Sequence, residues 1–312
     1  MRALVLGGVG FIGKHLCHKI LQQSDDNAVV ALDNLDTSRL AVTQEFAGYR
    51  PGSYVFIQED HKTISEDLLL RLAENVDIIY HLAGSVGVEL GDKEPKRTLY
   101  NNVELMMKIM PILEKAGKHV VFASTSEIYG NGPSFNENDP AGIGPSKYTR
   151  WGYSTTKLLS EFMLRVSGLP HNIIRFFNIV GPGQLPDYGM VLPRFVDAVK
   201  NDRSPIVHGD GSQIRSFCHI DDAVEMVLRV HEHPGELFNI GNSDNAISMR
   251  DLAHKVIEVA GSDVLVDYAG YGDVFSERFE DIMYRVPDTT KIRSMTGYEP
   301  KYTLEDIIKD VL

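Results

Sequence analysis

Residues 3–13, ALVLGGVGFIG, hold a short apolar run followed by glycines, three of which recur at intervals of three residues. The run at 3–6 has the length and composition of a buried strand, and helical periodicity extends over 11–23. A strand that enters a helix through a glycine-rich turn is the first unit of a dinucleotide-binding domain. This stretch therefore predicts the fold class of the N-terminal part of the chain.

The rest of the chain repeats the alternation of strand and helix. Alternation of this kind is typical of parallel strands joined by right-handed crossovers. We predict an α/β fold with a doubly wound parallel sheet, the Rossmann arrangement. Further apolar runs lie at 28–32, 54–57, 76–82, 119–124 and 171–177, and helical periodicity at 68–74, 97–115 and 151–167.

The texture of the sequence changes after Asn178. Glycine and proline cluster at 181–189, and later segments mix isolated strands with candidate helices at 221–233 and 249–260. A ligand cleft is expected between the two parts, at the carboxyl ends of the strands. The predicted boundaries are 1–177 for the cofactor-binding domain, rejoined by parts of 206–240, and 178–312 for a smaller, mainly substrate-binding lobe.

Composition excludes several classes of function. The chain has 312 residues and a net charge of −12, which opposes binding to nucleic acid or to anionic membranes. Cys17 and Cys218 are far apart and lack metal-ligand spacing, so no zinc site or disulfide framework is expected. Glycines interrupt the apolar N-terminus, and no stretch reaches the roughly 18 apolar residues of a membrane span. We expect a cytoplasmic protein without metal, nucleic acid or membrane partners.

The glycines of the first stretch have distinct expected roles. Gly7 can form the tight turn, Gly10 lets a pyrophosphate approach the backbone, and Gly13 lets the helix pack closely on the strand. Phe11 and Ile12 belong to the same loop and are expected to contact the cofactor.

An acidic residue at the end of the second strand selects the cofactor. A carboxylate at Asp33 accepts hydrogen bonds from the adenosine ribose and repels a 2′-phosphate, which favours NAD over NADP. Asn34 is assigned to the same site. Asp60, after the third strand, is expected either at the adenine edge or as a helix cap.

The fourth strand ends in small residues. Leu82, Ala83 and Gly84 let the backbone pass close to the cofactor, so they are also assigned to its site. The preceding His81 is expected to be a core histidine with its hydrogen bonds satisfied.

A second group of residues, Thr125, Tyr153 and Lys157, has the side chains needed for catalysis. Thr125 follows an apolar run, and Tyr153 is followed one helical turn later by Lys157, so tyrosine and lysine share a helix face. These groups can oxidise a secondary alcohol beside a hydride acceptor. Lys157 and the oxidised nicotinamide should lower the pKa of the Tyr153 phenol and make it a usable base, while Thr125 hydrogen-bonds the same substrate oxygen. The neighbouring Ser126 and Glu127 are included in the site.

At this point the sequence resembles a family, the extended short-chain dehydrogenase/reductases that modify nucleotide sugars. The resemblance covers nearly the whole chain and rests on the order and spacing of its motifs. These are GGVGFIG at 7–13, Asp33-Asn34, HLAG at 81–84, STSEIYG at 124–130, YSTTK at 153–157, RFFNIVGPG at 175–183, HGDGSQIRSF at 208–217 and RVPDTTKI at 285–292.

The resemblance implies oxidation at C4 of a hexose carried by a nucleoside diphosphate, with the hydride later returned from NAD. Re-reduction from the other face gives epimerisation, loss of the 6-hydroxyl gives dehydration, and loss of a 6-carboxylate gives decarboxylation. The order Thr-Ser-Glu, the pair Arg150-Trp151 and the segment FEDIMYRVP at 279–287 resemble UDP-glucuronate decarboxylases, but a class of UDP-sugar 4-epimerases shares these features. Dehydratases of dTDP-glucose usually carry aspartate at position 126, and those of GDP-mannose usually use NADP.

The resemblance also implies the residues that bind substrate. Arg215 and Arg285 match positions that grip the diphosphate, a task that suits the planar guanidinium fork. Asn178 matches a residue that hydrogen-bonds a phosphate or sugar oxygen, and Val191 lies in a segment expected over the nucleoside base. Some UDP-glucuronate 4-epimerases hold the substrate carboxylate with an arginine near the position where this chain has Gly183-Gln184-Leu185. The absence of this arginine weakens the assignment of a uronate as the substrate.

The leading hypothesis is therefore 4-epimerisation of a UDP-hexose or UDP-hexuronate, narrowly ahead of UDP-glucuronate decarboxylation, with 4,6-dehydration a further alternative. A non-catalytic NAD-binding regulator is disfavoured because Thr125, Tyr153 and Lys157 occur together. A net alcohol dehydrogenase leaves Arg215 and Arg285 without a role. A homodimer through the helices at 97–115 and 151–167 is implied by the resemblance alone.

Overall fold

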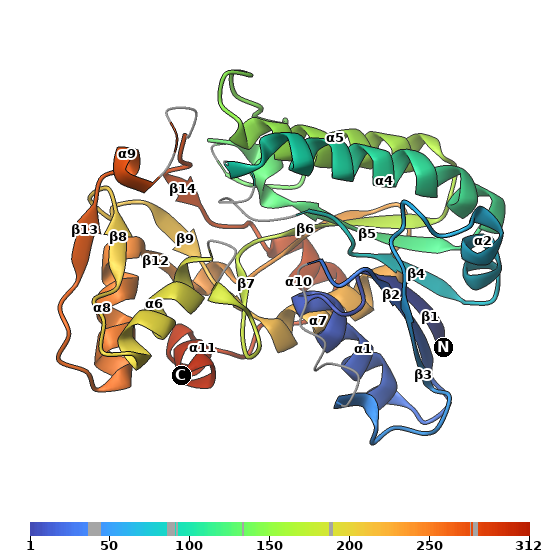
Figure 1. The fold of residues 1–312 in the computed structure, drawn as a ribbon, viewed down its shortest axis with the longest axis horizontal. Helices are drawn as coiled ribbons and strands as arrows, with labels where there is room; N and C mark the ends of the chain where they lie inside the picture. The colour runs from blue at the N-terminus through green and yellow to red at the C-terminus, as the bar shows by residue number, and fades with distance from the viewer. Residues whose placement is uncertain are drawn as a thin grey trace.

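The computed structural model describes residues 1–36, 45–85, 91, 93–132, 134–186, 190–274, 276 and 280–312. The larger part of the chain has three layers, with a central sheet between two layers of helices (Figure 1). A smaller part, on the left of Figure 1, lies beyond the carboxyl ends of the central strands.

The central sheet has seven parallel strands in the order β11-β6-β5-β4-β1-β2-β3. The order runs outward in both directions from β1 and β4, so the loops after these two strands leave toward opposite faces and open a crevice. The α/β prediction is confirmed, and each of the six predicted runs contains a strand. The strands are β1 (Arg2–Leu6), β2 (Ala28–Asp33), β3 (Tyr54–Gln58), β4 (Ile78–His81), β5 (His119–Thr125), β6 (His171–Phe176) and β11 (Leu237–Ile240).

Helices cover both faces of this sheet. On one face α4 packs between α2 and α5, and on the other α1 packs against α7. In Figure 1, α4 and α5 run side by side along the upper edge. The helices of these layers are α1 (Phe11–Gln23), α2 (Glu66–Glu74), α4 (Pro95–Ala116), α5 (Arg150–Val166), α7 (Ile220–Arg229) and α10 (Thr290–Thr296).

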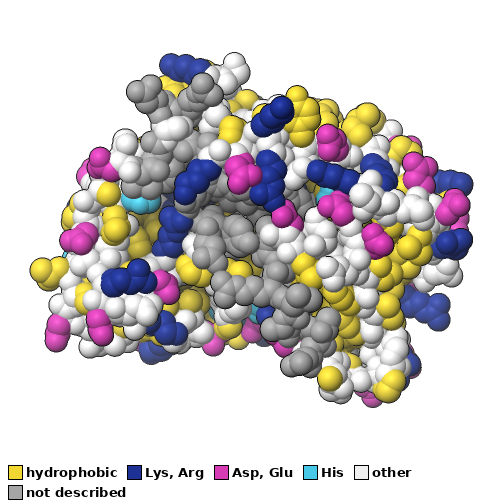
Figure 2. Space-filling view, viewed as in Figure 1, with side chains coloured by type: hydrophobic (Ala, Val, Ile, Leu, Met, Phe, Trp, Pro, Cys, Tyr) yellow, Lys and Arg dark blue, Asp and Glu magenta, His cyan; other side chains and the backbone are white. Residues whose placement is uncertain are grey.

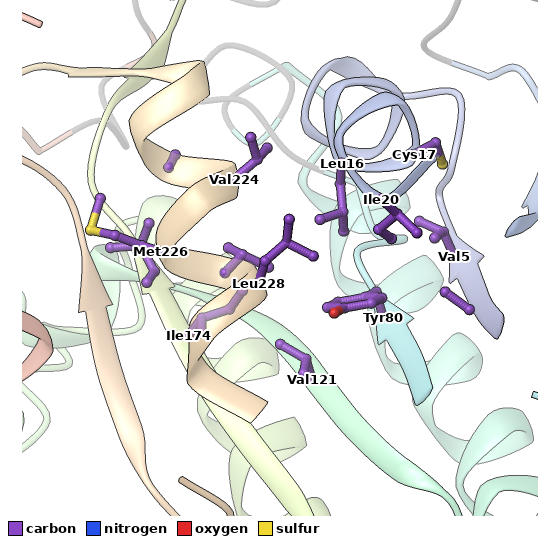
Figure 3. Packing of buried hydrophobic residues seen from close by; sticks show 14 of the residues in the cluster. Val5, Leu16, Cys17, Ile20, Tyr80, Val121, Ile174, Val224, Met226 and Leu228 are labelled. Carbon is purple, nitrogen blue, oxygen red and sulfur yellow. The ribbon is translucent and has the colours of Figure 1, made fainter. Parts of the chain in front are cut away.

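Two apolar clusters hold the three layers together. Side chains from β1, β4, β5 and β6 meet those of α1 and α7 in the cluster of Figure 3, where Tyr80 and Leu16 are fully buried. The second cluster fills the space between the sheet and the layer of α2 and α4. Because β4 is buried along its whole length, it reads as a continuous apolar run rather than an alternating one.

Helix ends follow the local sequence. Ser65 caps α2 by accepting a hydrogen bond from the backbone amide of Leu68. Pro95 occupies the first turn of α4, and Gly117 ends that helix in the left-handed conformation with φ of 65°. The bounds of α4 and α5 therefore agree closely with the periodicity of the sequence.

The smaller part has its own core around Leu192, Phe195, Leu252 and Ile308. Strands β12, β9 and β14 form one small sheet, and β13 pairs with β8. The short strands β7 and β10 pair near the boundary with the larger part. Its elements are β7 (Ile179–Val180), α6 (Val191–Lys200), β8 (Ile206–His208), β9 (Ile214–Ser216), β10 (Cys218–His219), β12 (Ala246–Ser248), α8 (Met249–Ala260), β13 (Asp267–Ala269), α9 (Tyr271–Val274), β14 (Tyr284–Arg285) and α11 (Leu304–Val311).

Strand β11 did not stand out in the sequence because its apolar run is short. It pairs in parallel with β6 and extends the central sheet by one strand after the chain has passed through the smaller part. None of the helices in the described part of the chain is both long and apolar enough to span a bilayer.

Gly13 is the position where an added methyl group conflicts most directly with the fold of the first turn. A Cβ there would lie 2.1 Å from the carbonyl oxygen of Gly7. We expect Gly13→Ala to lower the free energy of unfolding by about 1–3 kcal/mol, as overpacking does. Gly48→Ala, where nothing lies within 4 Å, is the matched control and should change it by less than about 0.5 kcal/mol. Urea unfolding of both variants measures the difference, and equal stabilities would contradict this packing argument.

Candidate active site

A cavity of about 720 Å³ opens at the carboxyl ends of the central strands. Its wall combines the loops after β1, β2, β4 and β5 with α5 and with residues of the smaller part. Figure 2 shows Lys and Arg side chains interleaved with Asp and Glu across the middle of the face that is drawn. The predicted residues on its wall are Gly7, Gly10, Phe11, Ile12, Gly13, Asp33, Asn34, Asp60, Leu82, Ala83, Gly84, Thr125, Ser126, Glu127, Tyr153, Lys157, Asn178 and Arg285.

The glycine loop forms one end of this cavity. The amide of Gly7 donates to the carbonyl of Leu32 at 2.8 Å, and φ of 79° places Gly7 in the left-handed region. A Cβ on Gly7 would lie 2.8 Å from the backbone nitrogen of Ala83, so the turn packs directly on the loop after β4. The close approach leaves backbone amides at the start of α1 for a pyrophosphate.

Asp33 holds the loop as well as lining the cavity. One carboxylate oxygen accepts a hydrogen bond from the amide of Val9 at 3.1 Å, and the other accepts from the amide of Leu35 at 2.8 Å. Leu35 itself has φ of 63°, which turns the chain sharply after β2. The Asp33 carboxylate thus lies where it could accept hydrogen bonds from the ribose hydroxyls of a dinucleotide, and this arrangement fits NAD.

Asp60 is a turn residue. It accepts hydrogen bonds from the side chain of Asn34 at 2.9 Å and from the amide of Lys62 at 2.7 Å. These bonds lower the pKa of Asp60, although partial burial opposes them as the largest single influence. The helix-cap alternative is wrong because Ser65 caps the following helix.

His81 is buried as expected, but its hydrogen bonds are not satisfied as expected. It ends β4 with an exposed fraction of 1%, and neither ring nitrogen has a partner among the described residues. Burial lowers the pKa of His81 to about 3, and the nearby Lys157 lowers it further. The ring is therefore neutral and packs edge-on against Phe122.

Thr125, Tyr153 and Lys157 come together on the cavity wall. The ammonium of Lys157 donates to the carbonyl of Ala123 at 2.9 Å, which fixes it beside the end of β5. Burial lowers the pKa of Lys157 to about 8, while the carboxylate of Glu161, one turn further along α5, raises it. The phenol of Tyr153 is hydrogen-bonded to Thr125.

The predicted lowering of the Tyr153 pKa is wrong for the groups that the protein itself supplies. Burial raises the pKa of this phenol, and the negative charge of Glu127 raises it further. The hydrogen bond to Thr125 and the charge of Arg285 act in the opposite direction but are weaker. The ammonium of Lys157 donates its hydrogen bond to the Ala123 carbonyl and not to the phenol.

Glu127 is buried between two arginines. Arg150 donates to both carboxylate oxygens, from Nε at 2.6 Å and from Nη2 at 2.8 Å, and Arg285 also donates to Oε1. Burial alone would raise the pKa of Glu127, but the two guanidinium groups lower it to about 2. The carboxylate is therefore ionised throughout the neutral range.

The assigned substrate residues divide into two groups. Arg285 and Asn178 line the cavity and hydrogen-bond each other. Arg215 lies behind them in β9 and pairs with Asp281 at 2.9 Å. Val191 begins α6 and is not on the cavity wall, whereas its neighbour Met190 is.

Three further residues support the site and were not assigned to it from the sequence. Arg150 stands three residues before Tyr153, a helical spacing that could have indicated its role. Glu161 stands one turn after Lys157, binds Arg175 through both oxygens and accepts a hydrogen bond from Ser124 at 2.5 Å. Asp281 lies in a loop before β14, within the segment 279–287 whose resemblance to decarboxylases could have indicated its role.

Similarity to known proteins agrees with this geometry. Residues 3–241 match the NAD dependent epimerase/dehydratase family. The chain belongs to this family. It is accordingly an NAD-dependent enzyme, and the cofactor prediction is confirmed.

Relatives of this epimerase/dehydratase span its full length. It is 31% identical to a UDP-N-acetyl-alpha-D-glucosaminuronate decarboxylase of Bacillus cytotoxicus, over all of this chain and 96% of the relative. It is 30% identical to UDP-glucuronic acid decarboxylase 6 of Arabidopsis thaliana, over 98% of this chain and 86% of the relative.

Among solved structures, similarity extends to epimerases. A UDP-glucuronic acid 4-epimerase from Bacillus cereus, solved with UDP-glucuronic acid and NAD, has a TM-score of 0.85 at 25% identity over 99% of this chain and 97% of the other. A UDP-glucose 4-epimerase from Thermotoga maritima has a TM-score of 0.84 at 25% identity over 100% and 97%.

The lowered pKa of Glu127 predicts a pH dependence of stability. A carboxylate with a folded pKa near 2 and an ordinary pKa of 4.5 stabilises the fold fully above pH 4.5 and loses this contribution as the pH falls toward 2. We expect this contribution to be about 3 kcal/mol. Urea unfolding between pH 7 and pH 3 measures it in the wild type and in Glu127→Gln.

The variant should be less stable at pH 7, because two buried arginines lose their partner. It should nevertheless lack the part of the acid slope that Glu127 supplies. Glu258→Gln removes an exposed carboxylate and serves as the control that retains the slope. The same slope in Glu127→Gln as in the wild type would contradict the assigned pKa.

Proposed function

We propose that this enzyme decarboxylates a UDP-linked hexuronate through a transient 4-keto sugar. The observation that carries the proposal is the buried cluster of Glu127 with Arg150 and Arg285 beside Thr125 and Tyr153. Simple oxidation and reduction at C4 do not require such a cluster. Full-length relatives that decarboxylate UDP-hexuronates support the same choice.

The first step is oxidation at C4. Bound NAD supplies a hydride acceptor that later returns the hydride, and Gly7, Gly10, Gly13 and Asp33 are the residues proposed to hold it. Tyr153 takes the proton of the 4-hydroxyl, and Thr125 hydrogen-bonds the same oxygen. The raised pKa of Tyr153 means that the positive charge of the oxidised cofactor has to favour the phenolate in the complex.

Decarboxylation follows from the chemistry of the 4-keto sugar. Its carboxylate is attached to C5, next to the new carbonyl, so the C5–C6 bond can break and leave its electron pair in a C4–C5 enolate. Carbon dioxide departs, a proton is added at C5, and the hydride returns to C4. No net oxidation results, so no second substrate is required.

Glu127 serves this step as a fixed anion and not as a proton donor. With a pKa near 2 it carries no proton at neutral pH. Its charge holds Arg150 and Arg285 in place, and Arg285 reaches the cavity where it can pair with the sugar carboxylate or the diphosphate. Asn178, bonded to Arg285, orients the same guanidinium from the other side.

A second candidate is 4-epimerisation of a UDP-hexose or UDP-hexuronate, the reaction that the sequence placed first. Structural similarity to the UDP-glucuronic acid and UDP-glucose 4-epimerases favours it. Both reactions share the 4-keto intermediate, so Thr125, Tyr153 and Lys157 have the same roles in each.

Product analysis separates the two reactions. We expect the purified enzyme to convert UDP-N-acetylglucosaminuronate or UDP-glucuronate to the corresponding pentose product with loss of carbon dioxide, measured by mass spectrometry and proton NMR. UDP-glucose and UDP-N-acetylglucosamine are the matched substrates without the carboxylate and should remain unchanged. Epimers of unchanged mass would instead establish the second candidate.

The same assay tests the oxidation step. Tyr153→Phe should lower turnover by more than about a hundredfold, because it removes the proton acceptor. Turnover close to that of the wild type would show that another group takes the proton.

We further propose a homodimer that buries the outer faces of α4 and α5. Apolar side chains are exposed at spacings that place them on one side of each helix, including Met107 on α4 and Phe162 and Val166 on α5. Val166 is 83% exposed. A second copy with the same faces would cover these side chains in a twofold arrangement.

Sedimentation tests this assembly. The wild type is expected to be a dimer at micromolar concentration, and Phe162→Glu should convert it to a monomer because a charge would be buried in the interface. Leu265→Glu, at an exposed apolar residue of the smaller part, is the control that should leave the dimer intact. A monomeric wild type would exclude the proposed interface.

A further inference from the structure

Asp281 joins two arginines that come from different parts of the chain. Its Oδ1 accepts hydrogen bonds from Arg150 at 3.1 Å and from Arg215 at 2.9 Å. Its Oδ2 accepts from the hydroxyl of Tyr271 at 2.8 Å, and the amide of Ile282 also donates to Oδ1 at 2.8 Å. The carboxylate is thus held from four directions.

These contacts form a continuous chain of charges. It runs from Arg215 in β9 through Asp281 to Arg150 at the start of α5, and from there to Glu127. Arg215, Arg150 and Glu127 are all buried, so each depends on its neighbours for charge compensation. Arg285 adds a third cation against two carboxylates, which leaves an excess of positive charge for an anionic substrate.

The two residues at the ends of this row of ion pairs are expected to have different functions. Glu127 belongs to the chemistry at the sugar, and Arg215 is expected to bind the diphosphate. Asp281 is not on the cavity wall, but it holds the guanidinium groups of Arg215 and of Arg150, and Arg150 lines the cavity. The guanidinium groups of Arg150 and Arg215 share one carboxylate oxygen of Asp281, so a displacement of either arginine changes the position of the other.

We infer that Asp281 is a positioning residue that couples binding of the substrate diphosphate to the placement of Glu127. The inference rests on the proposed function for the role of Glu127, but its first test needs no turnover. By linkage, a contact that transmits the effect of diphosphate binding to Glu127 also transmits a change at Glu127 to diphosphate binding.

The probe is UDP alone, whose affinity for the NAD-loaded enzyme is measured by calorimetry. Asp281→Asn should weaken UDP binding by about tenfold, the effect of losing one hydrogen bond to a charged group. Asp273→Asn removes an acidic residue from the same region without touching the arginines and should leave the affinity within about twofold. Equal affinities of the Asp281 and Asp273 variants would overturn the inference.

A double-mutant cycle tests the coupling itself. Glu127→Gln should change UDP affinity in the wild-type background by at least about threefold and should have less effect when Asp281 is already asparagine. Additive effects of the two substitutions would show that Asp281 does not connect the sites. Because the readout is UDP binding, the result stands whether the reaction proves to be decarboxylation or epimerisation.

A conservative variant separates positioning from a loss of folding. Asp281→Glu keeps the charge and should recover most of the UDP affinity that Asp281→Asn loses, with NAD content and thermal unfolding monitored in both. Turnover of Asp281→Glu at saturating substrate should still fall by about tenfold, because the longer side chain displaces Arg150. Wild-type turnover with this variant would exclude the positioning role.

Discussion

Charge compensation around Glu127 is the constraint on which the arrangement of the two parts of the chain depends. A carboxylate buried this deeply is tolerated because Arg150 and Arg285 lie against its oxygens. The first arginine comes from the α/β domain and the second from β14 in the smaller part. Satisfying one buried charge therefore brings the two parts together at the wall of the cavity.

The parallel sheet supplies the other half of the site through its topology. All seven strands run in the same direction, so the glycine loop, Asp33 and Thr125 lie at the same edge although they are far apart in the chain. Helix α5 then places Tyr153 and Lys157 beside Thr125. The sheet thus determines where the glycine loop and the group of Thr125, Tyr153 and Lys157 are located, and the buried charges of Glu127, Arg150 and Arg285 lie on the wall of the same cavity.

Much of this could be predicted from the sequence because it depends on short-range patterns. The strand, glycine turn and helix at 3–23, and the tyrosine and lysine one turn apart, are features of consecutive residues. Two ion pairs, Arg285 with Glu127 and Arg150 with Asp281, join residues more than a hundred positions apart in the sequence. No periodicity of the sequence encodes such contacts. The raised pKa of Tyr153 could not be predicted either, nor could a His81 ring that lacks a hydrogen-bond partner among the described residues, since both depend on how deeply the fold buries these side chains.

Asp33 has two roles, and this has a consequence for redesign and for evolution. Both of its carboxylate oxygens hold backbone amides, one in the glycine loop and one after β2. Replacing it with a smaller residue to admit a phosphorylated cofactor would also release the glycine loop after β1. Coenzyme preference in this chain is therefore not an independent trait: a change from NAD to NADP would have to alter the turn at Leu35 and the loop at Val9 together with Asp33.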